Sequence, residues 1–386
     1  MKTGFLILFA MAAGSAVVAQ SPSAMPGVSE PVWQMEESGT TAGLRGIVSV
    51  DGTLAWASGT EGTVLRTVDG GAHWTKCAVP DGDKDGATLD FRGVQAWDQK
   101  TAIVMASGPG EKSRLYKTTD GCKTWVLLFK NPDTPDGFFD SAYLMREQRS
   151  RGKNEGFGLL LGDPVHGELS VFETRDGGDN WIRLHDAMLS SEGGAFAASN
   201  GCVRGMNATD DFVIGGKTQS VVLRLNYSGH YWLNDGSALS RTWSERVLPL
   251  ASGTESAGAF AISSHVTISY GKTKDQALGL KFSEVAVGGD YAKPNDSKGT
   301  AAFSRDGGGQ WLTSARPPHG YRSTVQWGES IHAWITAGTN GSDISRDDGK
   351  TWQPLDDGNW NALSLPFIVG PKGRIARLNA AALPKQ

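Results

Sequence analysis

The stretch Thr67-Val68-Asp69-Gly70-Gly71-Ala72-His73-Trp74 decides the fold, because the chain contains four further copies of its pattern. Each copy fits Ser/Thr-x-Asp-x-Gly/Cys-x-x-Trp. The aspartate and tryptophan of the copies are Asp69 and Trp74, Asp120 and Trp125, Asp176 and Trp181, Asp306 and Trp311, and Asp347 and Trp352. Repetition at this scale indicates an array of similar structural units.

The residue types in this pattern predict a tight turn between two strands. An aspartate can accept hydrogen bonds from the backbone N–H groups that follow it. The glycines after it adopt positive φ, which a sharp reversal of the chain requires. The tryptophan then begins the returning strand and buries a large apolar surface. Each aspartate therefore has a sufficient structural role, and we interpret the repeats as evidence for the fold and not for catalysis.

The composition agrees with an all-β protein that has many tight turns. The 386 residues include 51 glycines and 13 tryptophans, and the glycines fall between short apolar runs. The formal net charge is −4, and the basic residues do not form a tract. Nucleic-acid binding therefore has no electrostatic support.

The N-terminus has the features of a secretory signal. Lys2 is followed by an apolar run, and Ala16-Val17-Val18-Ala19 ends in a small residue. We expect a signal peptide over residues 1–19, a flexible leader over 20–31 and a single β-propeller domain over 32–386. No cysteine stands directly after the predicted cleavage point, where a lipoprotein would carry its lipid, so we expect no membrane anchor after cleavage. The expected location is periplasmic or secreted.

The three cysteines are Cys77, Cys122 and Cys202. Their number is odd and no two of them form a CxxC pair, so the spacing predicts neither a disulfide framework nor a zinc site. Cys122 occupies a position that is glycine in other copies of the turn. Packing is the expected role of all three, and no metal or cofactor is predicted.

The spacing of the turns predicts seven four-stranded blades. The gap between Asp176 and Asp306 is more than twice the others, which leaves room for a blade that has lost its turn motif. Residues 362–378 supply three strands of a last blade. Residues 32–35 resemble the tryptophan-led outer strand of the other blades, and they can complete the last blade and close the ring. A six-bladed ring is the alternative.

Three segments are longer than a blade needs. Residues 146–155 are a charged insert in the third blade, for which we expect a solvated loop. Residues 227–240 are an insertion in the fourth blade. Residues 265–281 in the fifth blade are predicted to be an insert or an additional hairpin.

The turn motif resembles the Asp-box of sialidase-like β-propellers. The longer phrase Leu44-Arg45-Gly46, Ala57-Ser58-Gly59-Thr60-Glu61-Gly62 and the first Asp-box resembles propellers related to the photosystem II stability/assembly factor. This resemblance covers the whole predicted mature chain. It implies a non-enzymatic exported scaffold that binds a protein partner.

The blade order places the candidate binding residues on the face opposite the Asp-boxes, around the central channel. These candidates are Arg45, Arg92, Asp163, His166, Lys217, Asp290, Tyr291, Arg322 and Lys372. The most specific hypothesis is that the guanidinium groups of Arg45, Arg92 and Arg322 converge to bind one carboxylate. The alternative is that they stack on aromatic rings or bind backbone carbonyls of the channel wall.

The alternative function is a glycoside hydrolase or a sialidase-like enzyme acting on a glycan. Asp163 and Asp290 could serve hydrolysis if their carboxyl groups lay about 5 to 10 Å apart. However, the chain has no Arg-Ile-Pro motif near the first blade, and no HExxH, Walker loop or GxSxG elbow. The prediction is therefore a protein-binding scaffold, with no catalytic residue assigned.

Overall fold

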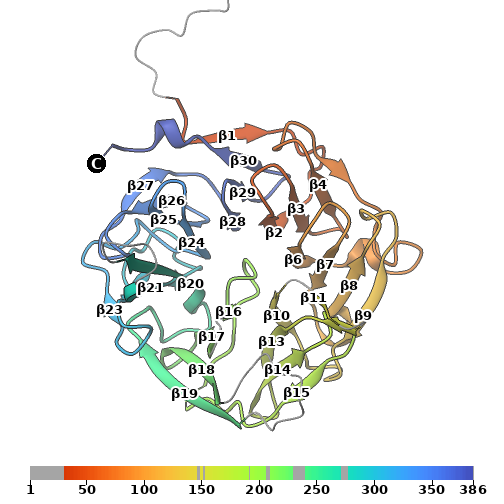
Figure 1. Cartoon of the computed structure of the whole chain (residues 1–386), viewed down its shortest axis with the longest axis horizontal. Coiled ribbons are helices and arrows are strands. Elements are labelled where there is room, and N and C mark those ends of the chain that lie inside the picture. The colour runs from red at the N-terminus through yellow and green to blue at the C-terminus, as the bar shows by residue number, and fades with distance from the viewer. Residues whose placement is uncertain are drawn as a thin grey trace, which may run out of the picture.

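Seven four-stranded antiparallel sheets surround a central channel (Figure 1). The computed structural model describes residues 30–145, 148–150, 153–190, 192–205, 209–228, 240–270 and 277–385. The seven-bladed β-propeller predicted from the sequence is confirmed, and the six-bladed alternative is wrong. The proposed signal peptide over 1–19 and all but the last two residues of the proposed leader lie outside the described residues.

The first three blades are built from residues 44–184, with each blade running from the channel outward. Blade 1 contains β2 (Leu44–Ser49), β3 (Ala55–Gly59), β4 (Val64–Thr67) and β5 (Thr75–Lys76). Blade 2 contains β6 (Phe91–Ala96), β7 (Ala102–Ala106), β8 (Arg114–Thr118) and β9 (Val126–Lys130). Blade 3 contains β10 (Phe139–Leu144), β13 (Gly158–Val165), β14 (Glu168–Thr174) and β15 (Ile182–Leu184).

The remaining blades follow the same plan. Blade 4 contains β16 (Val203–Gly205), β17 (Thr209–Ile214), β18 (Ser220–Ser228) and β19 (Ser240–Leu248). Blade 5 contains β20 (Ala257–Tyr270), β21 (Ala277–Asp290), β22 (Ala301–Ser304) and β23 (Leu312–Thr313). Blade 6 contains β24 (Thr324–Gly328), β25 (Ala333–Gly338), β26 (Gly341–Ser345) and β27 (Gln353–Asp356). Blade 7 contains β28 (Ala362–Ser364), β29 (Phe367–Val369) and β30 (Ile375–Leu378), completed by β1 (Trp33–Glu36).

The two ends of the chain close the ring in blade 7. β1 pairs antiparallel with β30, with Trp33 opposite Leu378. The Trp33 indole is 5% exposed, donates a hydrogen bond to Ser342 Oγ at 2.8 Å and lies 6.1 Å from the Trp360 ring. The closing outer strand predicted over residues 32–35 is therefore confirmed, and it covers the outer edge of β30 as the fourth strand of the last blade.

The hydrophobic core lies between neighbouring blades. The second strands, such as β3 and β7, are buried along their whole length, whereas the outer strands β5 and β9 are largely exposed. One core cluster joins Leu44 of blade 1 to Phe367 of blade 7, so apolar packing also crosses the point of closure. The described helices are three 3₁₀ turns, η1 (Gly86–Thr88), η2 (Gly110–Lys112) and η3 (Ala380–Ala382). Within the described ranges, no helix has the length and apolar composition needed to cross a bilayer.

The Asp-boxes form the tight turns that the sequence predicts. In blade 1, Thr67 Oγ1 donates to Asp69 Oδ1 at 2.9 Å and accepts from the Gly71 N–H at 3.0 Å. Asp69 Oδ1 also accepts from the His73 N–H at 2.9 Å, and these bonds lower the pKa of Asp69 to about 2. The order of antiparallel strands puts these third-to-fourth connections on the same face as the first-to-second connections. We call this the Asp-box face and the opposite one the mouth face.

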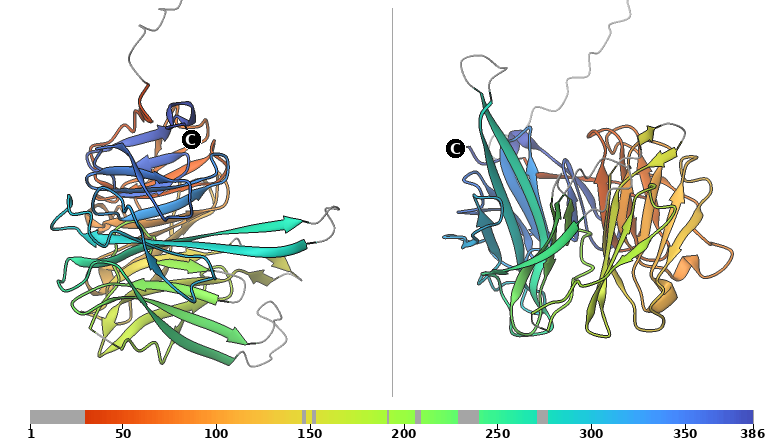
Figure 2. Two further views of the ribbon diagram at one scale, coloured as in Figure 1. Left: turned by 90° about the vertical axis from the view of Figure 1, so that its left-hand side faces the viewer. Right: turned by 60° about the horizontal axis from the view of Figure 1, so that its bottom comes forward.

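All three long insertions belong to connections on the Asp-box face. Residues 146–155 include the hairpin β11 (Gln148–Ser150) and β12 (Lys153–Glu155), so the loop predicted there is wrong. The predicted insertion over 227–240 extends β18 and β19, although residues 229–239 lie outside the described residues. In blade 5, β20 and β21 form one long hairpin that projects from the disc (Figure 2), which confirms the additional-hairpin interpretation.

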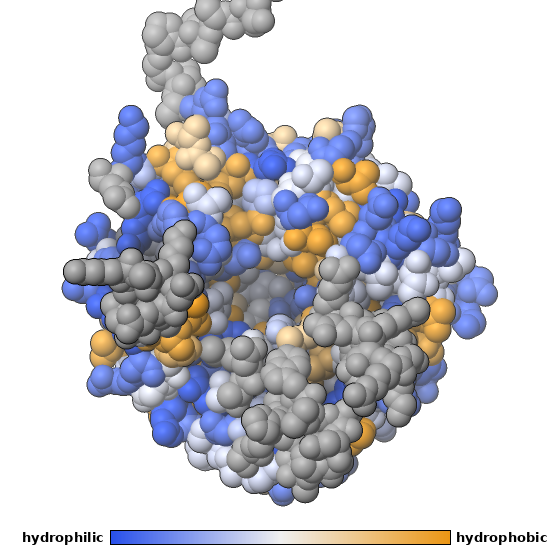
Figure 3. All heavy atoms as spheres, in the orientation of Figure 1, coloured by the Kyte–Doolittle hydropathy of each residue, from blue (hydrophilic) through white to orange (hydrophobic). Residues whose placement is uncertain are grey.

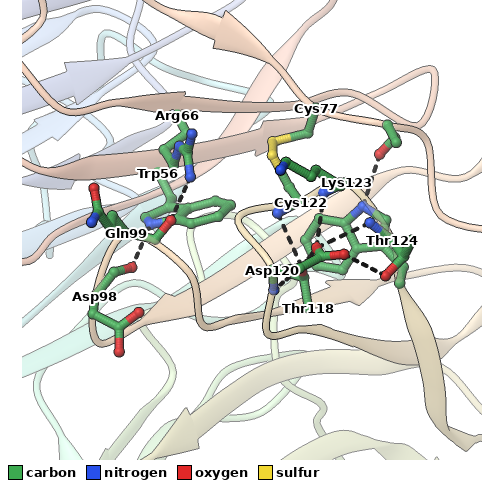
Figure 4. The surroundings of a disulfide bond; sticks show 12 residues. Trp56, Arg66, Cys77, Asp98, Gln99, Thr118, Asp120, Cys122, Lys123 and Thr124 are labelled. Atoms are coloured by element: carbon green, nitrogen blue, oxygen red, sulfur yellow. Dashed lines mark hydrogen bonds between the residues drawn. A yellow bond between two sulfur atoms is a disulfide. The ribbon is translucent and has the colours of Figure 1, made fainter.

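A disulfide joins the outer parts of blades 1 and 2. Cys77 follows β5, and its sulfur is bonded to that of Cys122 in the Asp-box of blade 2 (Figure 4). Cys122 has φ +64°, which fits the glycine that other Asp-boxes have at this position. Cys202 is a free, buried thiol. The expectation that all three cysteines serve only in packing is therefore wrong for the first two.

Candidate functional site

A β-bulge at the start of the innermost strand occurs in four blades. The strand register shifts between Leu44 and Gly46, Phe91 and Gly93, Phe139 and Ser141, and Ala259 and Ala261. The extra residues at these shifts are Arg45, Arg92, Asp140 and Phe260. A bulge leaves one residue unpaired and redirects its side chain. The same backbone feature therefore presents two arginines, an aspartate and a phenylalanine near the channel.

Three of these bulge residues line a cavity of about 390 Å³ at the channel on the mouth face. Its wall also includes Phe196, Tyr291, Tyr321 and Asn361. Aromatic packing fixes part of this wall, because the Phe260 ring lies 3.9 Å from Phe196 and 4.8 Å from Tyr321. Figure 3 views the ring from the opposite side, the Asp-box face, from which the β20–β21 hairpin projects, and shows a hollow at the centre of that face.

The two mouth arginines converge on a carboxylate of the protein itself. Arg92 Nε donates to Asp90 Oδ2 at 2.8 Å, and Arg92 Nη1 donates to the Ala197 carbonyl at 3.0 Å. Arg45 Nε lies 3.9 Å from Asp90 Oδ1 and makes no hydrogen bond within the described part of the chain. Two cations therefore share one anion, and the pocket keeps a net positive charge.

Arg322 does not join the other two arginines. Its side chain is 0% exposed, and its Nε donates to Asp343 Oδ2 at 2.7 Å. Its Nη1 also donates to the Tyr321 carbonyl at 2.6 Å. The hypothesis that three arginines converge is wrong, because Asp343 on β26 binds the third guanidinium within blade 6, and the alternative of binding backbone carbonyls holds for Arg322 and Arg92.

Asp140 and Asp163 form a pair of carboxyl groups beside the mouth. Asp140 is 2% exposed, and its Oδ2 has no hydrogen-bond partner among the described residues. Burial and the nearby Asp163 carboxylate raise the pKa of Asp140 well above its usual range, although Arg92 opposes this shift. Burial also raises the pKa of Asp163 to about 6. At neutral pH this pair can hold a proton or attract a cation.

A second cavity, of about 480 Å³, adjoins the mouth and shares Phe196 with it. Asp163, Glu192, Glu255 and Lys217 supply its charged groups. Lys217 Nζ lies 3.1 Å from Glu255 Oε1, so one acid is paired and the cavity keeps a net negative charge. We call this space the acidic cavity. It brings together two of the predicted site residues, Asp163 and Lys217.

Asp290 and Tyr291 are adjacent in the sequence but face different spaces. Asp290 Oδ1 accepts from the Ala292 N–H at 3.0 Å, and its Oδ2 lies 3.4 Å from Lys293 Nζ. This carboxylate lines a third cavity, apart from Asp163, so the two do not form the pair considered for hydrolysis. Tyr291 is 52% exposed and stands at the channel mouth with its ring edge-on to Phe260.

His166 and Lys372 occupy turns on the mouth face. Both are exposed and both have positive φ, 54° and 58° respectively. Neither lines the channel mouth or the acidic cavity. The described residues contain no cluster of three or more His, Cys, Asp or Glu side chains suited to a metal ion.

Sequence reasoning missed Asp140, Phe260 and Asn361. The signal was present, because Phe139-Asp140-Ser141 stands in blade 3 where Phe91-Arg92-Gly93 stands in blade 2. Reading the same position in every blade would have found the aspartate. The residues that flank Phe260 and Asn361 in the sequence are less distinctive, so no motif singles these two out.

The comparisons with known proteins give one curated relative and a set of similar folds. No protein-family model matches the chain. The "Photosystem II assembly lipoprotein Ycf48" of Synechococcus sp. (strain CC9902) is 22% identical over an alignment of 259 residues that covers 59% of this chain and 70% of the relative. The chain is therefore homologous to Ycf48 and has the predicted resemblance to the photosystem II assembly factor.

Two solved structures agree with the fold. One is YCF48 bound to a D1 peptide, with TM-score 0.52 and 18% identity, covering 92% of this chain and 99% of the other. The second is YCF48 from Cyanidioschyzon merolae, also with TM-score 0.52 and 18% identity, covering 90% and 98% respectively. At this level of identity the likeness concerns the architecture.

Proposed function

We propose that this homologue of Ycf48 is an exported, non-enzymatic scaffold that binds a segment of a protein partner at the mouth of its channel. The observation that carries the proposal is the sequence homology to an assembly factor across most of the relative's length. A related propeller has been solved with a D1 peptide, which makes a peptide a reasonable kind of ligand.

The mouth has the chemistry that a peptide segment needs. Phe260, Tyr291 and Tyr321 offer apolar surface, and Arg45 offers a guanidinium group on a side chain that is 34% exposed. Arg92 adds a second guanidinium close to the same carboxylate. Rigid aromatic groups and arginines are the residue types that contribute most to protein interfaces. An acidic or carboxylate-bearing segment suits the net positive charge.

The disulfide supports export. Cys77 and Cys122 form a bond that persists in an oxidising compartment such as the periplasm or the extracellular space. The predicted signal peptide over residues 1–19 points the same way. Fractionation of the native host should find the mature chain outside the cytoplasm with this bond formed, and a variant lacking residues 2–19 should stay inside with both thiols free. A cytoplasmic mature chain would contradict export.

The binding proposal is tested by site-specific photocrosslinking in the native host. A benzoylphenylalanine at Tyr291, on the mouth, should crosslink a defined partner, whereas the same group at Leu312, an equally exposed residue of the outer strand β23, should not. The double variant Arg45→Gln/Arg92→Gln should lose the crosslink. Arg246→Gln, which removes one charge from the exposed outer strand β19, should keep it. Equal crosslinking from Leu312 and Tyr291 would overturn the placement.

A glycoside hydrolase is supported less well. Hydrolysis of this kind needs two carboxyl groups that both reach the glycosidic bond. Asp163 lines the acidic cavity, but its neighbour Asp140 is 2% exposed, and Asp290 lines a separate cavity. Turnover of a glycan library that Asp163→Asn abolishes would favour the enzyme over the scaffold.

A further inference from the structure

We propose that the acidic cavity is a subsite for the side chain of a lysine or arginine, placed beside the mouth so that one partner segment can engage both. This inference rests on the proposed function, because it takes the ligand to be a segment of a protein. It concerns a different set of residues, however, and can be tested without the partner.

The first support is the unbalanced charge of the cavity. Asp163, Glu192 and Glu255 face one lysine, Lys217, which is paired with Glu255 at 3.1 Å. No hydrogen bond or cation offsets the burial of the Asp163 carboxyl within the described part of the chain. Asp163 is partly buried, and partial burial of a carboxyl without a partner is unfavourable. A cationic hydrogen-bond donor would supply what the site lacks.

The second support is Asp140, which lies behind Asp163. Asp140 is the unpaired bulge residue after Phe139, and Phe139 pairs with Gly162, the residue before Asp163. It is 2% exposed, and its Oδ2 is without a hydrogen-bond partner among the described residues. Two neighbouring carboxyl groups thus have unused acceptor atoms. An ammonium or guanidinium group in the cavity would therefore bind Asp163, which lines the wall, with the closed-off Asp140 carboxyl behind it.

The third support is a wall of glycines that keeps the cavity open. A Cβ atom on Gly193 would lie 2.5 Å from the Gly215 carbonyl oxygen, and one on Gly194 would lie 2.6 Å from Asp163 Oδ1. Gly194 and Gly215 are held together by two reciprocal backbone hydrogen bonds of 3.0 Å. Larger residues would fill the space in front of the carboxylate, so a ligand can approach the backbone closely.

The chemistry favours an organic cation over a metal ion. Calcium takes six to eight oxygen ligands, and magnesium demands a nearly ideal octahedron. The described residues hold no cluster of three or more potential metal ligands. A cavity of about 480 Å³ is also much larger than an ion needs, and it suits a long side chain with some water.

The acidic cavity lies next to the mouth, so one partner segment could contact both. It shares Phe196 with the positively charged mouth, so the two spaces adjoin on one face. A segment with an acidic group at the mouth and a basic side chain in the cavity would match both charges. Complementary charges of this kind fix the register and direction of a bound chain.

The test is an amide-resolved NMR titration of the full mature protein with small probes. Acetyl-lysine amide and acetyl-arginine amide should shift the amides of Gly193, Gly194 and Gly215, whereas neutral acetyl-norleucine amide should not. Asp163→Asn should weaken the basic probes by about tenfold or more, because it removes a charged hydrogen bond. Asp83→Asn makes the same charge change at an exposed position in the loop before β6 and should have no effect.

A second variant changes the shape of the acidic cavity without changing its charge. Gly194→Ala keeps every charge, but its methyl group would displace the Asp163 carboxylate, so it should also weaken binding of the basic probes.

The affinity for the basic probes should rise with pH through about 6 in the native chain, because the pKa of Asp163 is about 6 and the carboxyl loses its proton there. This rise should vanish in Asp163→Asn. The charged or titratable groups that face Asp163 or line its cavity are Asp140, Arg92, Cys202, Glu192, Lys217 and Glu255.

Three results would overturn the inference. One is equal shifts with the neutral probe, and another is no shift of the cavity glycines with either basic probe. The third is saturation by calcium chloride alone, which would indicate a metal site. If the mouth variants lose the partner while the basic probes fail to bind, the proposed function stands and this subsite does not exist.

Discussion

Removal of the disulfide between Cys77 and Cys122 should destabilise the ring measurably. The bond joins residues separated by 45 positions in the sequence and links two blades that also meet through side-chain packing and through hydrogen bonds such as that from the Ala78 N–H to the Cys122 carbonyl. The double variant Cys77→Ala/Cys122→Gly removes it with the least local disturbance. Glycine fits the φ of +64° at position 122, and Gly71 and Gly178 of other Asp-boxes also have positive φ, +94° and +97°.

The magnitude follows from the length of the closed loop. In the chain-entropy treatment, a loop of about 45 residues stabilises the folded state by about 4 kcal/mol at 25 °C. For a chain of 386 residues this corresponds to a fall in Tm of about 5 °C, with the entropy of unfolding taken as about 2.1 cal/mol/K per residue. Cys77→Ala/Cys122→Ala should be about 1 kcal/mol less stable again, because alanine at positive φ is strained.

The assay combines denaturant unfolding with thiol counting. Unreduced chain, fully unfolded, should expose the single thiol of Cys202, out of three cysteines in the sequence. Cys202→Ala serves as the matched control, because it removes a buried cysteine without cutting a cross-link. Three reactive thiols in the exported protein would refute the bond. Unchanged stability of both double variants would refute the entropic reasoning.

Three further perturbations test the closure and the buried charges. Trp33→Ala should cost about 3 to 5 kcal/mol in urea unfolding, because it empties the space beside Trp360 and loosens the closing strand. Asp343→Asn should cost a similar amount by leaving Arg322 buried without its carboxylate, and Arg322→Met/Asp343→Leu should recover most of that loss; no recovery would contradict the reasoning. The hydrogen bond to Asp343 raises the pKa of His319 above 6.5, so the stability from that pair should be complete below pH 6.5 and disappear as pH rises through the raised pKa. His319→Gln should remove this dependence from a series of Tm measurements, and an unchanged profile would exclude His319 as its source.

The fold could be predicted from the sequence because each Asp-box is determined locally. Thr67, Asp69 and Gly71 satisfy one another within five residues, so the turn does not depend on the rest of the chain. The closure by Trp33 was also predictable, since one blade lacked a strand and one spare strand remained. The hairpin over residues 146–155 was not predicted, because its charged composition lacks the alternation that identifies a strand.

The disulfide and the true position of Arg322 could not be predicted, because both depend on distant residues. Cys77 and Cys122 meet only once blades 1 and 2 are packed side by side. Arg322 stands in Tyr321-Arg322-Ser323, a phrase close to Phe91-Arg92-Gly93, yet the two side chains take different directions. The difference is Asp343, a partner in another strand whose presence no local pattern reveals.

The bulges explain how one architecture can acquire a particular specificity. The backbone feature recurs at Arg45, Arg92, Asp140 and Phe260, so the residue can change there while the geometry is kept. Blades 1 and 2 contribute cations, and blade 3 contributes an acid that lies next to Asp163 of the neighbouring cavity. The charge around the channel therefore changes sign between adjacent blades. Because blade order is fixed by the sequence, a segment bound across this boundary would have one preferred direction, and reversing Arg92 and Asp140 in a double exchange should reverse or abolish that preference.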